Sequence, residues 1–364
     1  MKILVLNSGS SSVKYTLFDT GNPTIGGLIE RVGDYDAAIS EVLAKVGRID
    51  AVGHRVVHGG DVYTDAVRIT PGVIETIESL IPLAPLHNPA NLSGIRAVLK
   101  LYPQVPQIAV FDTSFHQSIP EYAYRYALSE RLYEEDGIRR YGFHGTSHRY
   151  LLKAASGFLR RPPETLNLIT FHLGNGDSVC AIREGKSVDI SMGFTPLEGL
   201  IMGTRCGDID PEIVIYLSKH KQMEIERIDT LLNKESGLMG ICGMSDMRDI
   251  AEAAQNGDEK ASLAIEMFAY HAKKYLGSYF AVLGKVDAIV FSGGIGEHSA
   301  MIREKILEGL DHLGIQVDPS KNRQEISETF EVQAVGSALK ILVAHTDEER
   351  EIAEECERLL VSLE

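Results

Sequence analysis

Two short strings rich in glycine and serine hold the residues of this chain that are best suited to bind phosphate. The first is Asn7-Ser8-Gly9-Ser10-Ser11-Ser12, with Lys14 just beyond it, and the second is Leu173-Gly174-Asn175-Gly176-Asp177-Ser178. Small residues let a phosphate approach the backbone N–H groups closely, and a lysine can neutralise its charge. Each string separates two apolar runs, so each predicts the turn of a β-hairpin. Two matching turns favour a duplicated fold that grips a nucleotide between its halves.

Two arginines are candidates for holding a second anion. Arg55 lies in VGHRVVHGG, at the end of an apolar run and before a glycine pair, and Arg205 lies in TPLEGLIMGTRCGDIDP. A lone arginine is usually a solvated surface group, but an arginine beside a turn can clamp an oxyanion with two parallel hydrogen bonds. Of the nearby carboxylates, Asp210 has the simpler interpretation of a helix N-cap before Pro211.

Several histidines and carboxylates are further candidate site residues. His54 and His58 are four residues apart, as are His144 and His148, a spacing that binds zinc on a helix. Adjacent glycines disfavour a helix at each first histidine, so a hydrogen bond to a phosphoryl oxygen fits these side chains better than a metal. Asp112 and Glu348 are the preferred carboxylates, because Mg²⁺ on a nucleotide needs only one or two.

Composition and missing motifs exclude several classes of function. The net charge is −15, which disfavours nucleic acid or an anionic membrane as a partner, and no stretch is long enough to span a membrane. The four cysteines form no CxxC pair and indicate reduced thiols in the cytoplasm. The chain lacks GxxxxGK[ST], and Ser299 stands where a dinucleotide fingerprint needs its third glycine.

The elements that must position these residues alternate in type, which predicts an α/β fold with mixed sheets. Helices are expected to begin at Thr70-Pro71, Asn88-Pro89 and Asp210-Pro211, where a capping residue precedes proline. Besides the two hairpins, strands are expected at 50–57, 107–111 and 286–291, and further helices at 259–283 and from Glu348. The long helix at 259–283 is either core or part of a subunit interface.

Taken together, long strings spread over essentially the whole chain resemble the acetate kinase family, of the acetate and sugar kinase/Hsp70/actin superfamily. They are NSGSSSVKY, GHRVVHGG, PLAPLHNPAN, FDTSFH, RRYGFHGTSH, HLGNGDS, MGFTPLEGLIMGTRCGDIDP and SGGIGE. The resemblance implies two duplicated ribonuclease-H-like, actin-like ATPase domains with a central cleft, formed by residues 1–116 plus 351–364 and by 117–350. It also implies reversible phosphoryl transfer from ATP to acetate, with Mg²⁺ or Mn²⁺, in a homodimer.

The resemblance assigns roles residue by residue. Catalysis falls to Arg55, Asp112, His144 and Arg205, supported at the phosphates by Ser10, Ser12, His87 and Asn175, while Asn7 and Glu348 hold the metal. Arg55, Val57, Leu86, Phe143 and Pro196 bind the short acid. ATP binds Lys14, His172, Leu173, Gly174, Asn175, Gly176, Asp246, Met247, Arg248, Gly293, Gly294, Ile295, Gly296 and Glu297.

Rival functions stay open at this point. Val57 favours acetate, but a methyl-sized pocket rejects one added methylene by only about 1–3 kcal/mol, so a propionate or other short-chain carboxylate kinase is the main alternative. A sugar kinase would need polar groups where this chain has Val57, Leu86 and Phe143. A non-kinase ATP-binding protein of the actin/Hsp70 type, or a kinase using pyrophosphate or GTP, is a further alternative, and His298 bears on nucleotide preference.

Overall fold

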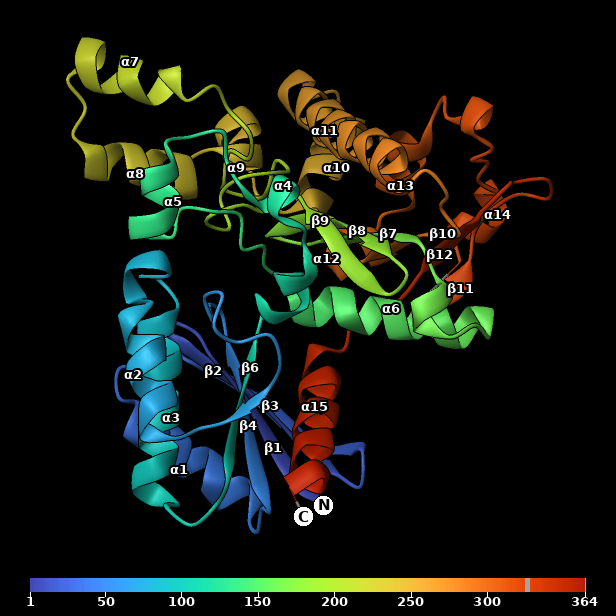
Figure 1. Ribbon diagram of the computed structural model, residues 1–364. Coiled ribbons are helices and arrows are strands. Elements are labelled where there is room, and N and C mark those ends of the chain that lie inside the picture. Colours follow the sequence, from blue (N-terminus) through green and yellow to red (C-terminus); the bar gives the residue numbers. More distant parts are fainter. Residues whose placement is uncertain (325–327, 364) are drawn as a thin grey trace. The chain divides into compact units, whose positions relative to one another are not determined.

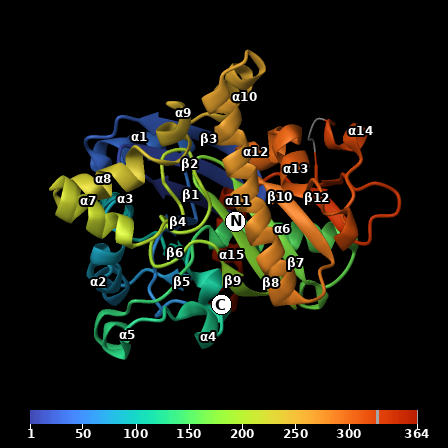
Figure 2. The ribbon, with the colours of Figure 1, turned by 90° about the horizontal axis from the view of Figure 1, so that it is seen from above.

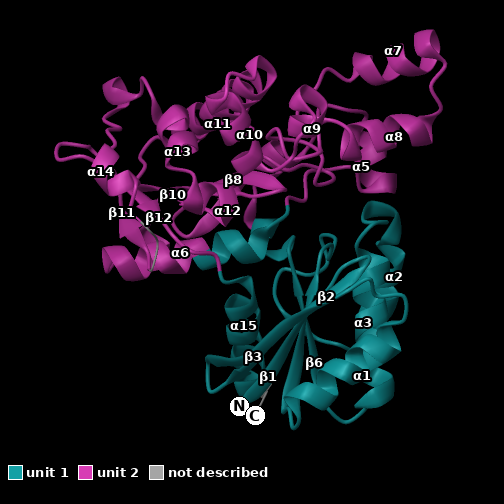
Figure 3. Ribbon diagram, turned by 180° about the vertical axis from the view of Figure 1, so that it is seen from behind, with its two compact units in different colours: residues 1–117, 143–150, 347–364 teal, residues 118–142, 151–346 magenta. Residues whose placement is uncertain are grey.

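The computed structural model divides the chain into two compact units (Figure 3). Unit 1 comprises residues 1–117, 143–150 and 347–364, and unit 2 comprises residues 118–142 and 151–346. The structure describes residues 1–324 and 328–363. Residues 325–327 and 364, which the predicted domains include, lie outside the described part.

Unit 1 is built on a mixed sheet in the order β3-β2-β1-β4-β6-β5 (Figure 1). Strands β1, β4 and β6 are parallel neighbours, and the others are antiparallel to theirs. Apolar side chains of α1, α2 and α3 cover one face, and those of α15 cover the other. Its elements are β1 (Lys2–Ser8), β2 (Ser12–Asp19), β3 (Asn22–Glu30), α1 (Tyr35–Val46), β4 (Ala51–Val56), β5 (Val67–Arg68), α2 (Pro71–Ser79), η1 (Ile81–Leu83), α3 (Asn88–Leu101), β6 (Gln107–Phe111), η2 (Ser114–Ser118, whose last residue belongs to unit 2) and α15 (Glu348–Leu363).

Unit 2 is built on a sheet in the order β11-β12-β10-β7-β8-β9. Helix α11 lies over this sheet (Figure 2) and, with α9, α10 and α13, buries the largest apolar cluster. Helix α6 (Gly145–Leu159) begins in unit 1 and continues in unit 2. The other elements are α4 (Glu121–Tyr124), α5 (Glu130–Asp136), η3 (Pro163–Thr165), β7 (Leu168–Leu173), β8 (Asp177–Arg183), β9 (Lys186–Ile190), α7 (Glu212–Lys221), α8 (Ile225–Lys234), α9 (Gly237–Cys242), α10 (Met247–Gln255), α11 (Glu259–Leu283), β10 (Ala288–Ser292), α12 (Gly293–His298), α13 (Ala300–Leu307), η4 (Asp311–Leu313), α14 (Pro319–Asn322), β11 (Phe330–Glu331) and β12 (Lys340–Val343).

The two sheets repeat one topology, which confirms the predicted duplicated α/β fold. In each, two hairpins run through the first three strands, the first strand pairs in parallel with a fourth, and the fourth pairs in parallel with the next. A short antiparallel strand lies at the far edge of each sheet. Both phosphate-type turns therefore occupy the same place in the repeat, between the first and second strands.

Two predicted helix starts are wrong in detail. Helix α7 begins at Glu212 with Pro211 in the N-cap position, although the Asp210 carboxylate still accepts the Glu212 N–H. Thr70 caps α2 as expected, accepting the Val73 N–H, but Asn88 does not cap α3, because the helix begins at Asn88 and His87 occupies the N-cap position. The buried Asn88 side chain instead accepts the His58 N–H and donates to the carbonyls of His58 and Ile77. A tertiary contact has replaced the local cap that the sequence pattern indicated.

Candidate functional site

Arg55, which is partly buried, and Asp112, which is buried, form an ion pair at the carboxyl ends of two neighbouring strands of unit 1. Strand β4 places Arg55 beside Val110 of β6, and the Asp112 N–H donates to the Val56 carbonyl directly after β6 ends. Arg55 Nε lies 3.1 Å from both Asp112 carboxylate oxygens, and Nη2 lies 2.7 Å from Oδ2. Burial lowers the pKa of Arg55, but Asp112 and then Glu348 outweigh it, so the pKa is raised and the guanidinium stays charged.

The start of α6 packs onto this pair. The Gly145 N–H donates to the Asp112 carbonyl at 2.9 Å, and a Cβ at Gly145 would lie only 2.2 Å from that oxygen, so only glycine fits. Thr146 donates to Asp112 Oδ1, and Ser147 donates to Glu348. His144, just before the helix, has a left-handed φ of 57°, and its carbonyl accepts the His148 N–H. Three predicted residues from separate parts of the chain, Arg55, Asp112 and Glu348, therefore meet in unit 1, and the residues that follow His144 pack against them.

Two asparagines hold the first turn in place, although neither was predicted from the sequence to belong to the site. Asn91 donates to the Ser8 carbonyl and accepts the Val57 N–H, and so joins the ends of β1 and β4, while Asn88 holds His58. Both are almost completely buried. Their only signal in the sequence was two amides three residues apart in the first turn of a helix. Lys14, predicted to bind ATP, pairs with Glu349 at 2.7 Å.

The predicted acid-binding residues differ in exposure. In unit 1, Val57 and Phe143 are buried, and the ring of Phe143 packs edge-on against His58, whereas Leu86 is 55% exposed. In unit 2, the Pro196 carbonyl accepts a hydrogen bond of 2.9 Å from Arg205 Nη1. Burial lowers the pKa of Arg205, an effect that the Asp177 carboxyl opposes.

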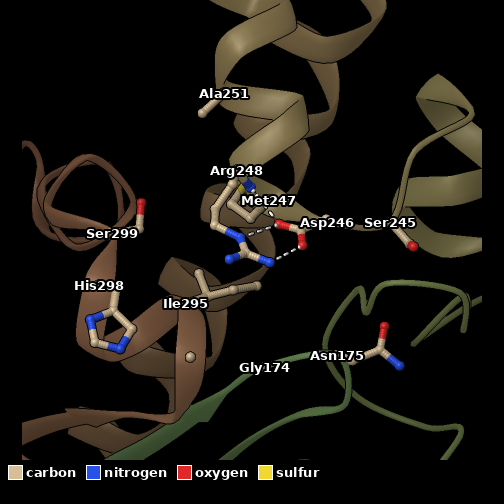
Figure 4. Close-up of a pocket in the computed structure, with 11 residues that line it drawn as sticks. Gly174, Asn175, Ser245, Asp246, Met247, Arg248, Ala251, Ile295, His298 and Ser299 are labelled. Carbon is tan, nitrogen blue, oxygen red and sulfur yellow. Dashed lines mark hydrogen bonds and ion pairs between the residues drawn. The ribbon is translucent and has the colours of Figure 1, made fainter.

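Unit 2 contains a cavity of about 680 Å³ at the second turn (Figure 4). Asp246 caps α10 and accepts two further hydrogen bonds from the Arg248 side chain, which lower the pKa of Asp246 to about 2. Arg248 and Ile295 both line the cavity (Figure 4). The lining residues are Gly174, Asn175, Ser245, Asp246, Met247, Arg248, Ala251, Gly294, Ile295, His298 and Ser299.

Most predicted nucleotide residues line this cavity or support its walls. Leu173 is buried in the core, and Glu297 turns inward, where its carboxylate accepts the N–H groups of Gly293 and Thr346 and a hydrogen bond from His345. Burial alone would raise the pKa of Glu297, and these bonds lower it. Glu297 thus braces α12. Ser245, Ala251 and Ser299 line the cavity without having been predicted, because no residue-type signal distinguishes them.

The oxygen donors of unit 1 suit a hard divalent cation. Asn7 offers an amide oxygen and Glu348 a carboxylate, and Mg²⁺ bound to a nucleotide takes one or two carboxylates with water and phosphate oxygens. Within residues 1–324 and 328–363, no group of three or more His, Cys, Asp or Glu side chains is arranged to hold a metal without such outside ligands. The donor set therefore fits a metal that arrives with phosphate.

A family profile, a curated relative and two solved structures are all similar to this chain. A profile of the acetokinase family matches residues 38–354. The acetate kinase of Sulfurovum sp. (strain NBC37-1) is 49% identical, with both chains covered in full. The crystal structure of Porphyromonas gingivalis acetate kinase superposes with a TM-score of 0.95 at 41% identity, covering 99% of each chain. A propionate kinase from Francisella tularensis gives a TM-score of 0.92 at 42% identity, covering 97% of this chain and 98% of that one.

Proposed function

The chain belongs to the acetokinase family, and on that premise we propose that it catalyses the reversible transfer of the ATP γ-phosphoryl group to acetate, giving ADP and acetyl phosphate. The observation that carries the proposal is the convergence of Arg55, Asp112 and Glu348 with the start of α6 in unit 1. A partly buried, permanently charged arginine suits a small carboxylate that has to be held beside a phosphoryl group.

Acetate needs no general base, because it is already ionised at neutral pH. The difficulty lies in bringing two anions together and in the charge that spreads over the phosphoryl oxygens in the transition state. In unit 1, Arg55 binds the carboxylate, Asp112 keeps Arg55 in place, and His144 donates to the phosphoryl group. In unit 2, Arg205 and the turn around Asn175 bind phosphoryl oxygens, supported by the Asn175 backbone bond to Gly203 and the Arg205 bond to Pro196.

The other predicted residues keep their proposed roles. Val57, Leu86 and Phe143 of unit 1 and Pro196 of unit 2 keep their proposed role in binding the short acid, and the first turn, with His87, Ser10 and Ser12, orients the phosphates. The cavity walls of unit 2 bind the adenosine. Mg²⁺, held by Asn7 and Glu348, would offset the phosphate charge. We further propose that the two structural units act as the two functional domains.

A propionate-preferring kinase is the second candidate, and the similarity to the Francisella tularensis propionate kinase favours keeping it in the test. Val57 and Phe143 are both buried, which supports a small acid. Because one methylene is worth only about 1–3 kcal/mol, activity on propionate below that on acetate is expected.

We also propose that the protein works in the cytoplasm as a homodimer. All four cysteines are free thiols, which suits a reducing compartment. None of the described helices is both long and apolar enough to cross a membrane. The dimer is supported by helix α7, which buries none of its residues although it carries several large apolar side chains.

The function is tested by trapping acyl phosphate with hydroxylamine in the presence of Mg-ATP and acetate, propionate, butyrate or glycerol. Release of ADP is followed in parallel, because glycerol yields no hydroxamate. Hydroxamate strongest with acetate is expected. Stronger signal with propionate would keep the mechanism and change the substrate, and ADP release without hydroxamate from any acid would contradict a carboxylate kinase.

A further inference from the structure

Asp177 is a buried acid inside the phosphate turn that the proposed mechanism does not use. It is the first residue of β8, directly after Gly174-Asn175-Gly176, and it is completely buried. Its Oδ1 accepts the Gly174 N–H at 2.6 Å. Its Oδ2 is also buried and has no hydrogen-bond partner in the part of the chain that the structure describes. A buried carboxylate oxygen left unpaired is costly, so this arrangement calls for a reason.

The surroundings of Asp177 are apolar except for one cation. Its position in β8 puts it on the same face as Val179 and Ala181, which belong to the core cluster with Leu173, Leu200 and Leu238. Arg205, on the segment after Gly203, is the one charged side chain among the described residues that acts on it appreciably. Of the other packed elements, α9 and α11 contribute apolar side chains to this cluster, and Glu297 of α12 is engaged by Gly293 and Thr346.

Two consequences follow from this geometry. The Gly174 amide is committed to Asp177, so the turn keeps its shape before any nucleotide arrives. An ionised Asp177 also offsets the charge of Arg205 and places a negative charge behind a turn that has to receive phosphate. Burial raises the pKa of Asp177 well above its usual range, and the Gly174 N–H and Arg205 only partly oppose this effect, so the carboxyl group holds a proton more readily than an exposed aspartate does.

We propose that Asp177 is a positioning residue of the phosphate turn, which fixes the Gly174 amide and makes nucleotide binding weaken with rising pH. The inference rests on the proposed nucleotide site in unit 2. Bound ADP and ionised Asp177 disfavour each other because both are anionic, so by linkage ADP raises the pKa of Asp177 and its binding takes up a proton.

The test compares ADP dissociation constants of the wild type and Asp177→Asn by calorimetry from pH 6 to 9. Asparagine keeps an acceptor for the Gly174 N–H and cannot ionise. The ratio of wild-type to variant dissociation constants is expected to rise with pH, by about tenfold for each unit by which ADP raises the Asp177 pKa. The ionisation of ADP itself cancels in this ratio. A ratio that is constant with pH would overturn the inference.

Asp189→Asn is the matched control, because Asp189 of β9 is a partly buried acid of the same sheet whose pKa burial also raises. Its ratio to the wild type is expected to be flat, and a rise equal to that of Asp177→Asn would contradict a specific role. Asp177→Ala, which loses both the charge and the Gly174 bond, should show the same rise with a lower kcat than Asp177→Asn. Equal kcat values would remove the positioning role.

A second measurement needs no variant. At pH 8 the phosphates of ADP are fully ionised, so calorimetry in two buffers with different ionisation enthalpies reports protons taken up by the protein. Net uptake is expected at pH 8 or at a higher pH, and zero uptake or release throughout pH 8 to 9 would overturn the inference even if Asp177→Asn does not fold. If the wild type fails to bind ADP at all, the proposed function fails with it, whereas normal ADP binding with a flat ratio removes only the role of Asp177.

Discussion

At the scale of single residues, the site depends on two partly buried arginines that differ in the groups that hold them. Arg55 has a bidentate carboxylate partner, Asp112, whereas Arg205 is anchored through the Pro196 carbonyl and a long contact with the Met202 sulfur. When no carboxylate is hydrogen-bonded to a guanidinium, less of its electrostatic attraction for an anionic ligand is offset. Arg205 is therefore the arginine whose removal tests the phosphoryl role most cleanly.

Arg205→Leu is expected to lower kcat by about 10³-fold or more, because an arginine acting on the phosphoryl group in its transition state is worth about 10³–10⁵ in rate. The measurement is steady-state turnover, with far-UV circular dichroism to confirm folding. Arg227→Leu is the matched control, since Arg227 of unit 2 is a half-exposed arginine paired with Glu235 at 2.7 Å. A folded Arg205→Leu protein with near-normal kcat would contradict the assigned role.

At the scale of elements, the sequence predicts the strands and long helices well but not the contacts that lock them. The bounds of strand 107–111, helix 259–283 and the helix from Glu348 agree with the structure. Apolar periodicity and capping residues are local signals, which is why they succeed. The bridging roles of Asn88 and Asn91 and the inward turn of Glu297 each involve at least one partner 30 or more residues away, and local patterns carry no information about such partners.

The same difference between local signals and distant contacts applies to the site residues. Arg55 and Asp112 could be paired from sequence in outline, because both follow apolar strands whose carboxyl ends meet at one sheet edge. Neither the closeness of Gly145 to Asp112 nor the burial of Asp177 could be predicted, since both depend on how a helix start or a hairpin turn packs in three dimensions.

Gly145→Ala is expected to disturb the site by shifting helix α6, without removing a reacting group. The added Cβ would lie 2.2 Å from the Asp112 carbonyl, so the start of α6 has to shift, carrying His144 and Thr146 with it. Such overpacking costs about 1–3 kcal/mol of stability, and we expect a marked fall in kcat. Thermal melting and turnover measure the two effects.

Gly157→Ala tests whether the effect belongs to this contact. Gly157 lies in the same helix, and a Cβ there would meet nothing within 4 Å. This control should keep its activity and gain about 0.5–1 kcal/mol of stability, because alanine is favoured over glycine within a helix. Equal loss of activity in both variants would contradict the account of α6.

At the scale of the whole molecule, we expect the buried histidines of unit 1 to make the fold less stable in acid. Burial lowers the pKa of His54 and His58 to about 4 and that of His116 to about 3. His54 donates to Gln107 at 2.7 Å in the core. In the unfolded chain these side chains bind protons near pH 6.5, so their neutral forms stabilise the fold fully only above that value.

The free energy of unfolding is therefore expected to fall as the pH drops from 6.5 towards 4, by up to about 1.4 kcal/mol for each unit of lowered pKa. Urea unfolding followed by circular dichroism at pH 8, 6 and 5 measures it. His54→Gln should reduce the slope with pH, whatever its effect on stability at pH 8. A stability independent of pH over this range would contradict the burial of neutral histidines.

The proposed dimer can be tested at the exposed apolar side chains of helix α7. Ile213, Ile215 and Tyr216 of α7 are between 40% and 50% exposed, an arrangement that a second copy of the chain would bury. Ile215→Glu is expected to shift the protein towards the monomer by multi-angle light scattering. Lys219→Glu, on the same helix, is the control for adding a carboxylate. A dimer unaffected by Ile215→Glu would place the interface elsewhere.

The central claim is that the carboxylate oxygen of acetate receives the phosphoryl group. We would incubate the protein with Mg-ATP and acetate labelled at both oxygens with ¹⁸O, cleave the product with hydroxylamine, and examine the released phosphate by ³¹P NMR. Hydroxylamine attacks the carbonyl carbon, so the bridging oxygen leaves with phosphate. Direct transfer predicts one ¹⁸O in each phosphate derived from acyl phosphate, and unlabelled phosphate throughout would contradict it, because water would then be the acceptor.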